Sequence, residues 1–166
     1  MYKNNNFPSI KGLLHARPQA WATVRSAENR GSLTGNVRFY QNPYGVLVIA
    51  EIHGLPQKTG PCDSAIFGFH IHEGESCTGN ASDPFADTRM HYNPYNCPHP
   101  YHSGDMPPLF AANGHAFSAF LTDRFSINEI IGKTVVIHDS PDDFSTQPSG
   151  NSGSKLACGQ IIGKRI

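Results

Sequence analysis

Two histidines stand two positions apart in the segment GFHIHEGESC, residues 68–77. The segment reads as a strand, in which His70 and His72 project to one face while Phe69 and Ile71 project to the other. A single histidine in a strand is most often a satisfied core or surface residue. Two imidazoles on one face, opposite a clean apolar face, instead indicate a pair of metal ligands.

A second group of ligand-type side chains follows in the segment HYNPYNCPHPYHSGD. It contains His91, His99, His102 and Asp105. Three imidazoles and one carboxylate make a complete tetrahedral shell for Zn²⁺, with no position left open. The alternative interpretation is a histidine-rich loop tip that binds no metal.

A further histidine, His138, ends the run KTVVIHD on the face opposite Val135 and Ile137. The remaining three histidines stand alone in the sequence, and we expect each of them to be structural or exposed: His15, His53 and His115. His115 is notable because it begins a predicted strand directly after a long loop.

Short strands joined by turns must position these side chains. The predicted strands cover residues 19–26, 31–41, 45–55, 64–73, 115–122, 133–139 and 157–165. The segment QNPYG predicts a turn between the second and third of them. Such a series is typical of an all-β sandwich or barrel. Residues 74–113 and 140–156 are predicted loops, and loops of this length are usually functional or disordered.

Composition limits the classes of protein to which the chain can belong. It has 166 residues, 13 Lys+Arg and 13 Asp+Glu, so its formal net charge is zero. A balanced charge argues against a nucleic-acid partner or a polybasic membrane contact. We expect one domain, residues 1–166, with a polar N-terminal extension over 1–16 and no transmembrane helix. The start lacks the apolar region of a secretory leader. The protein is therefore expected in the cytoplasm if Met1 is the native start, and otherwise secreted or periplasmic with its leader removed.

Five motifs occur in order along the chain: GFHIHE, HYNP, HSGD, IIGKTVVIHDSPDD and GNSG-K-LACG. Together they resemble the copper/zinc superoxide dismutase family from about residue 17 to the C-terminus. The resemblance implies an eight-stranded antiparallel Greek-key β-barrel, an immunoglobulin-like sandwich architecture of which this family is itself a standard example. It also implies that two long loops cover the metal site.

The resemblance implies a role for each ligand-type residue. The implied copper ligands are His70, His72, His91 and His138, and the implied zinc ligands are His91, His99, His102 and Asp105. His91 would bridge the two metals, and the Asp142 carboxylate would link a copper ligand to a zinc ligand. Because Zn²⁺ has no redox chemistry, copper would carry the electrons in the disproportionation of superoxide.

Two other functions remain open at this point. One is a zinc-stabilised, copper-binding relative without turnover, which would store or deliver copper. The other is a zinc-stabilised β-sandwich used for adhesion or binding. The resemblance also leaves a homodimer open.

Two details depart from the commonest pattern of the family. Lys155 stands where the family usually has an arginine that guides the anion to copper. A lysine keeps the charge but loses the two-pronged donor geometry, so we expect anion docking weaker by about 1 kcal/mol. His99 and His102 are only three positions apart, which leaves open which of them takes which zinc position.

The chain has four cysteines. Cys77 and Cys158 match the disulfide of the family, which would stabilise the fold by about 4 kcal/mol by closing a loop of roughly 80 residues. The alternative is two reduced core cysteines. We expect Cys62 not to pair with Cys97. Cys62 precedes His70 by eight residues, so an extended strand would place it about 25 Å from the copper end, whereas Cys97 lies in the zinc segment near that end.

Overall fold

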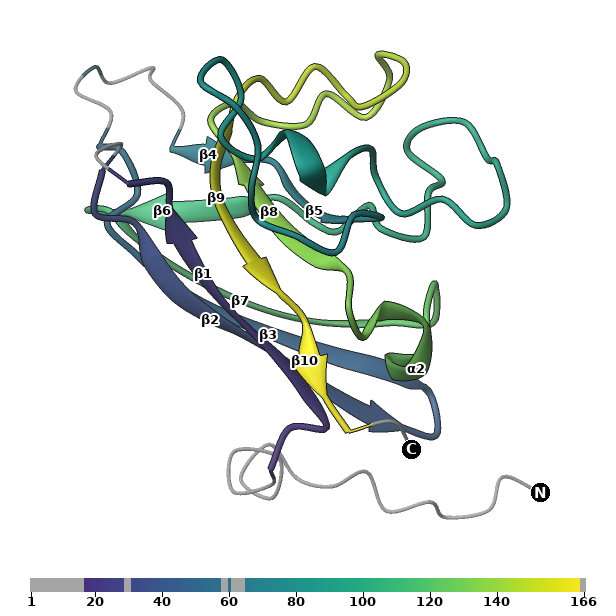
Figure 1. Ribbon diagram of the computed structural model, residues 1–166. Coiled ribbons are helices and arrows are strands. Elements are labelled where there is room, and N and C mark those ends of the chain that lie inside the picture. Colours follow the sequence, from purple (N-terminus) through teal and green to yellow (C-terminus); the bar gives the residue numbers. More distant parts are fainter. Residues whose placement is uncertain (1–16, 29–30, 58–59, 61–64, 165–166) are drawn as a thin grey trace.

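The structure, a computed structural model, describes residues 17–28, 31–57, 60 and 65–164 (Figure 1). The predicted N-terminal extension, His15 and Cys62 lie outside these residues. No helix in the described part of the chain is long and apolar enough to cross a membrane.

Each of the seven predicted strands is present. The elements are β1 (Ala20–Ser26), β2 (Thr34–Asn42), β3 (Gly45–His53), β4 (Ile66–Phe67), β5 (Phe69–His72), the 3₁₀ turn η1 (Ala86–Thr88), β6 (Leu109–Ala112), β7 (His115–Thr122), α2 (Ile127–Ile130), β8 (Thr134–His138), β9 (Lys155–Gln160) and β10 (Ile162–Gly163). Strand β6 was not predicted and occupies the end of the predicted loop 74–113. Its four residues follow two prolines and are too few to show alternation.

The strands form one antiparallel sheet in the order β4-β6-β7-β3-β2-β1-β9-β8-β5, with β10 paired to β1. Only Gly68 separates β4 from β5, and only Ile161 separates β9 from β10. Counted as two interrupted strands, these pairs reduce the described strands to eight. The interrupted strand β4/β5 pairs with β6 at one end of the order and with β8 at the other, so it closes the barrel. The predicted barrel fold is therefore confirmed.

Burial differs between the two sides of the barrel. In β1, buried Ala20, Ala22 and Val24 alternate with exposed residues, as expected for a strand with one face on the core and one in solvent. In β5 and β8 every residue is buried, because two loops cover the outer face of these strands. We call residues 73–108 the first loop and residues 139–154 the second loop. Figure 1 shows both loops gathered above β4, β5, β8 and β9.

Side chains tie the two loops to each other and to the barrel. The amide of Gln147 in the second loop accepts from the backbone N–H of His99 at 2.9 Å and donates to its carbonyl at 2.8 Å. The expected disulfide is confirmed: Cys77 of the first loop is bonded to Cys158 of β9, with 5.6 Å between the Cα atoms. Cys97 is a free, half-buried thiol.

Candidate metal centre

A first cluster of histidines lies on the outer face of β5 and β8, beneath the loops. These strands pair antiparallel, with His72 opposite Thr134, and His138 ends β8. The first loop brings His91 beside His72 through an isolated β-bridge. We call the four rings of His70, His72, His91 and His138 the strand cluster. All four are buried, and their ligand atoms lie within 4.8 Å of one another.

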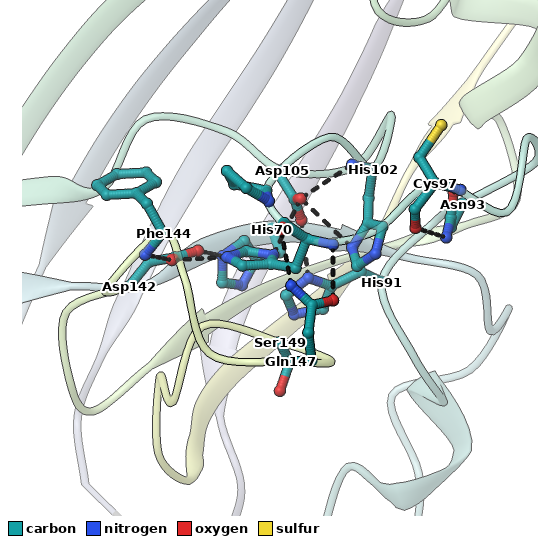
Figure 2. Close-up of polar contacts among 12 residues, drawn as sticks. His70, His91, Asn93, Cys97, His102, Asp105, Asp142, Phe144, Gln147 and Ser149 are labelled. Atoms are coloured by element: carbon teal, nitrogen blue, oxygen red, sulfur yellow. Dashed lines mark hydrogen bonds and ion pairs between the residues drawn. The ribbon is translucent and has the colours of Figure 1, made fainter.

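A second cluster lies within the first loop and shares His91 with the strand cluster. We call its members, His91, His99, His102 and Asp105, the loop cluster; their ligand atoms also lie within 4.8 Å of one another. Asp105 Oδ1 accepts from His91 Nδ1 at 2.8 Å, and Oδ2 accepts from the backbone N–H of His102 at 3.1 Å. Figure 2 shows the Asp105 carboxylate among these groups.

Four buried ring nitrogens have no hydrogen-bond partner among the described residues. They are His70 Nδ1, His91 Nε2, His99 Nδ1 and His102 Nδ1. The last two lie 3.1 and 3.3 Å from Asp105 Oδ2, without the geometry of a hydrogen bond. Buried polar atoms are normally paired. Four such nitrogens at the centre of two ligand clusters therefore fit metal ions, which would occupy their lone pairs.

Backbone carbonyls orient two further rings. His72 Nδ1 lies 2.9 Å from the carbonyl of Arg89, and His138 Nδ1 lies 3.3 Å from the carbonyl of Gly153. Because a carbonyl only accepts, each Nδ1 carries the proton. The Nε2 atoms of the two rings, 3.2 Å apart, then face each other inside the cluster. This is how ligating histidines are normally held.

One carboxylate connects the two clusters from outside. Asp142 Oδ2 lies 2.7 Å from His70 Nε2, and Asp142 Oδ1 lies 2.9 Å from His99 Nε2 (Figure 2). The backbone N–H of Phe144 also donates to Oδ1 at 2.7 Å. Burial alone would raise the pKa of Asp142, but these hydrogen bonds outweigh burial and hold the pKa well below its ordinary value. An ionised Asp142 keeps the proton of each ring on Nε2, so that Nδ1 is free to bind a metal.

Burial governs the ionisation of the strand cluster. It lowers the pKa of His70 to about 4 and that of His138 to about 3, and it lowers the pKa of His72 well below its ordinary value. Neighbouring imidazoles lower these pKa values further. Neutral imidazole is the form that binds metals, so this cluster is prepared for a cation at neutral pH.

Asp105 gives the loop cluster a different electrostatic character. Burial alone would raise the pKa of Asp105, but the hydrogen bond from His91 and the three neighbouring rings lower it. The pKa of His102 is also lowered, chiefly by burial and against the attraction of Asp105. The loop cluster therefore carries one negative charge from a side chain, whereas the strand cluster carries none.

Two glycines make room for this centre. Gly68, which interrupts β4/β5, accepts a backbone hydrogen bond from His138, and a Cβ there would lie 2.9 Å from the side chain of Ser152. Gly150 has φ +69°, and a Cβ there would collide with the Asp142 carboxylate and with His99 Nε2 at 2.7 Å. Glycine at 150 therefore lets the second loop cross the contact between Asp142 and His99.

Lys155 lies opposite His138 in the pairing of β8 with β9. Its ammonium group donates to Asp83 Oδ2 at 2.8 Å and to the carbonyl of Phe85 at 3.0 Å, and its side chain is only 15% exposed. Burial raises the pKa of Asp83, but the bond from Lys155 outweighs it and the pKa falls below its ordinary value. The cation that we expected to guide an anion is thus already paired with a carboxylate of the first loop.

Sequence reasoning found the ligand-type residues but missed Asp83 and Gln147. The structure brings together the residues that the motifs singled out, and their individual roles stay predictions. Asp83 is 72 positions from Lys155 and Gln147 is 48 from His99, and no local pattern marks either of them. His53 and His115, which stand alone in the sequence, are exposed, as expected. They lie opposite each other on β3 and β7 and are in contact.

Comparisons with known proteins point to one family. The model of the family "Copper/zinc superoxide dismutase" matches residues 33–161. A Cu-Zn superoxide dismutase of Deinococcus radiodurans is 32% identical over 157 residues, 82% of each chain. One of Legionella pneumophila is 34% identical over 135 residues, 76% of each chain.

Two other similar proteins are named only as superoxide dismutase-like. The superoxide dismutase-like protein YojM of Bacillus subtilis is 32% identical over 126 residues, covering 68% of this chain and 63% of its own. A crystal structure of a SOD-like protein from Bacillus subtilis, a double mutant with a tyrosine and a proline each replaced by histidine, superposes with a TM-score of 0.69. It is 27% identical and covers 86% of this chain and 97% of its own.

Proposed function

Because the chain belongs to the copper/zinc superoxide dismutase family, we propose that it disproportionates superoxide to oxygen and hydrogen peroxide at a paired copper and zinc centre. The strand cluster would hold copper, since imidazole suits copper and copper leads the affinity order of the divalent metals. The loop cluster would hold zinc, which favours a closed shell of nitrogen and oxygen ligands.

The observation that carries this proposal is the position of His91. It belongs to both clusters, with Nδ1 on the Asp105 side and an unpartnered, buried Nε2. A protein that only stores copper, or that uses zinc only for stability, has no need of one imidazole common to two sites. The rings of His91 and His70 stack at 3.9 Å between centroids, which supports the orientation of His91.

The residues of the chain would divide the work as follows. Copper, when bound, supplies the one-electron redox chemistry. His70, His72 and His138 hold it through nitrogens that Asp142 and two carbonyls orient. His91 Nε2 is the atom at which we expect a proton for the peroxide product to be held, because no residue in the described part of the chain is hydrogen-bonded to it. Asp105 keeps His91 in place through Nδ1.

Lys155 would attract the superoxide anion, although only part of its charge is available. The Asp83 carboxylate opposes it at 2.8 Å, so the positive field at the mouth of the site is weakened. We therefore expect turnover that is slower, at the association step, than an unpaired cation would allow.

The same ion pair favours a second candidate function. A copper-binding protein without turnover would not need to attract superoxide. Such a protein would lose nothing when Asp83 neutralises the charge of Lys155. The likeness to proteins named only superoxide dismutase-like is compatible with this alternative, which is storage or delivery of copper.

Superoxide dismutation by purified protein, with copper and zinc contents measured per chain, tests the proposal. We expect fast turnover at one copper and one zinc per chain, and loss of turnover to background in His138→Ala, which removes a ligand of the strand cluster only. His138→Ala should still bind zinc, since it leaves the loop cluster complete. Fully metallated protein without turnover would contradict the dismutase and favour the storage or delivery alternative.

A further inference from the structure

Two exposed histidines outside both clusters lie directly opposite each other on the barrel wall. His53 ends β3 and His115 begins β7, and the two are paired in the register of these strands. Directly opposed residues in an antiparallel pair project to the same face. Both side chains are exposed, so this face is the outer one.

The two rings meet through the same type of nitrogen. His53 Nδ1 lies 2.7 Å from His115 Nδ1, with the ring centroids 4.9 Å apart and the ring planes inclined at 78°. One Nδ1 donates its proton to the other. If the donor ring moves that proton to Nε2, which water can reach, two lone pairs converge on the same point.

The distance between the nitrogens is close to that of two ligands on one metal. Ligands at about 2.0–2.1 Å from a metal and in neighbouring positions are separated by about 2.9–3.4 Å. The pair has to open by only a few tenths of an ångström, which rotation of exposed side chains allows. The backbones are already held by the sheet, so binding does not have to order them.

The strand neighbours of the pair carry no uncompensated positive charge that would repel a cation. In the same row of the sheet, Thr34 lies beside His53 and Ala112 beside His115, and neither carries charge. Two positions away on the outer face of β3, Glu51 is bound at 2.6 Å by Arg38, so the positive charge of Arg38 is compensated.

We propose that His53 and His115 form a surface site for one divalent transition metal ion, with both Nδ1 atoms as ligands and water in the remaining positions. Imidazole nitrogens favour Cu²⁺, Zn²⁺ and Ni²⁺ over Mg²⁺ and Ca²⁺, and the affinity order places Cu²⁺ first. The site is separate from the strand and loop clusters and does not depend on the proposed function.

The test uses protein whose strand and loop clusters are already filled with copper and zinc. Cu²⁺ is then added, and the additional copper per chain is measured by equilibrium dialysis, with paramagnetic resonance used to detect nitrogen ligands. We expect one additional ion per chain with two nitrogen ligands. His53→Gln and His115→Gln should each weaken its binding by at least about tenfold, because each removes one of the two protein ligands.

His15→Gln is the matched control, because it makes the same substitution at another histidine of the chain, and it should leave the additional ion unchanged. The copper and zinc contents of the filled clusters report whether each variant is folded. The proposal is overturned if the additional copper survives both substitutions at the pair, or if it is lost in His15→Gln. It is also overturned if only half an ion binds per chain as the protein dimerises, since the ion would then join two copies.

Discussion

The strand cluster and the loop cluster share His91, but the chain assembles them in different ways. The loop cluster takes all its members from residues 91–105 of the first loop, and it includes a carboxylate. The strand cluster takes His70 from β5 and His138 from β8, which lie 68 positions apart, and it consists of imidazole rings without a carboxylate. One site is therefore local and charged, whereas the other exists only when the barrel has closed.

The largest expected effect comes from removing the charge of the local cluster. Asp105→Asn takes away the anion that faces His91, His99 and His102, so zinc affinity should fall by more than about 100-fold, beyond the usual effect of an outer partner. Metal content after dialysis measures this. Copper should be retained, because His70, His72 and His138 are untouched. Equal loss of both metals would show that the clusters are not separable.

The next largest effect should be a loss of metal affinity in both clusters. Asp142→Asn weakens the acceptor shared by His70 and His99, so the affinities for copper and zinc should both fall about 10–100-fold. Competition with a chelator measures both. Asp143→Asn is the control, since the Asp143 carboxylate is exposed and, among the described residues, accepts only from Ser145 and Thr146. A change in one metal alone would mean that Asp142 does not couple the clusters.

Acid should destabilise the metal-free protein through the strand cluster. The folded pKa values of His70 and His138, about 4 and about 3, lie below the ordinary value of 6.5. Between pH 6.5 and 4 the unfolded chain binds more protons than the folded chain, so stability falls as pH falls. The expected loss is on the order of 1–3 kcal/mol per histidine, measured by urea unfolding.

The variant His138→Gln sharpens this prediction. It removes one of the three rings whose pKa values burial lowers in the folded protein, so its stability should fall less steeply between pH 6.5 and 4. An equal slope in the variant and the original protein would show that the strand cluster does not control the acid response.

The smallest effect concerns the entrance to the strand cluster. Asp83→Asn should release the charge of Lys155 and tighten azide binding to the copper-loaded protein about two- to fivefold, as expected for an ion pair that solvent still partly screens. The ionic-strength dependence of turnover should become steeper. Asp87→Asn removes the same charge from the same loop and should change neither. Azide affinity that is unchanged in Asp83→Asn would mean that Lys155 does not attract anions.

Much of the architecture could be predicted from local patterns. Alternating apolar residues in several of the runs, together with turn signals, located the seven predicted strands, because a strand with one buried face must alternate. The predicted loop 74–113 extends too far, because its last residues form β6. This strand forms through its pairing with β4 and β7, and its own four residues are too few to show a pattern. The short helix α2, Ile127–Ile130, was not predicted either, because one turn is too short to produce a helical period in the sequence.

By itself, the sequence determined which chemical groups are present and which of them are neighbours along the chain. The loop cluster could be predicted from spacing, and so could the pairing of His70 with His72 on one face. Only the tertiary structure decided which distant groups meet. Strand pairing sets His53 against His115, the second loop places Asp142 between His70 and His99, and the first loop places Asp83 against Lys155. Such contacts depend on how the barrel closes, and a single sequence carries no local signal of partners that folding brings together.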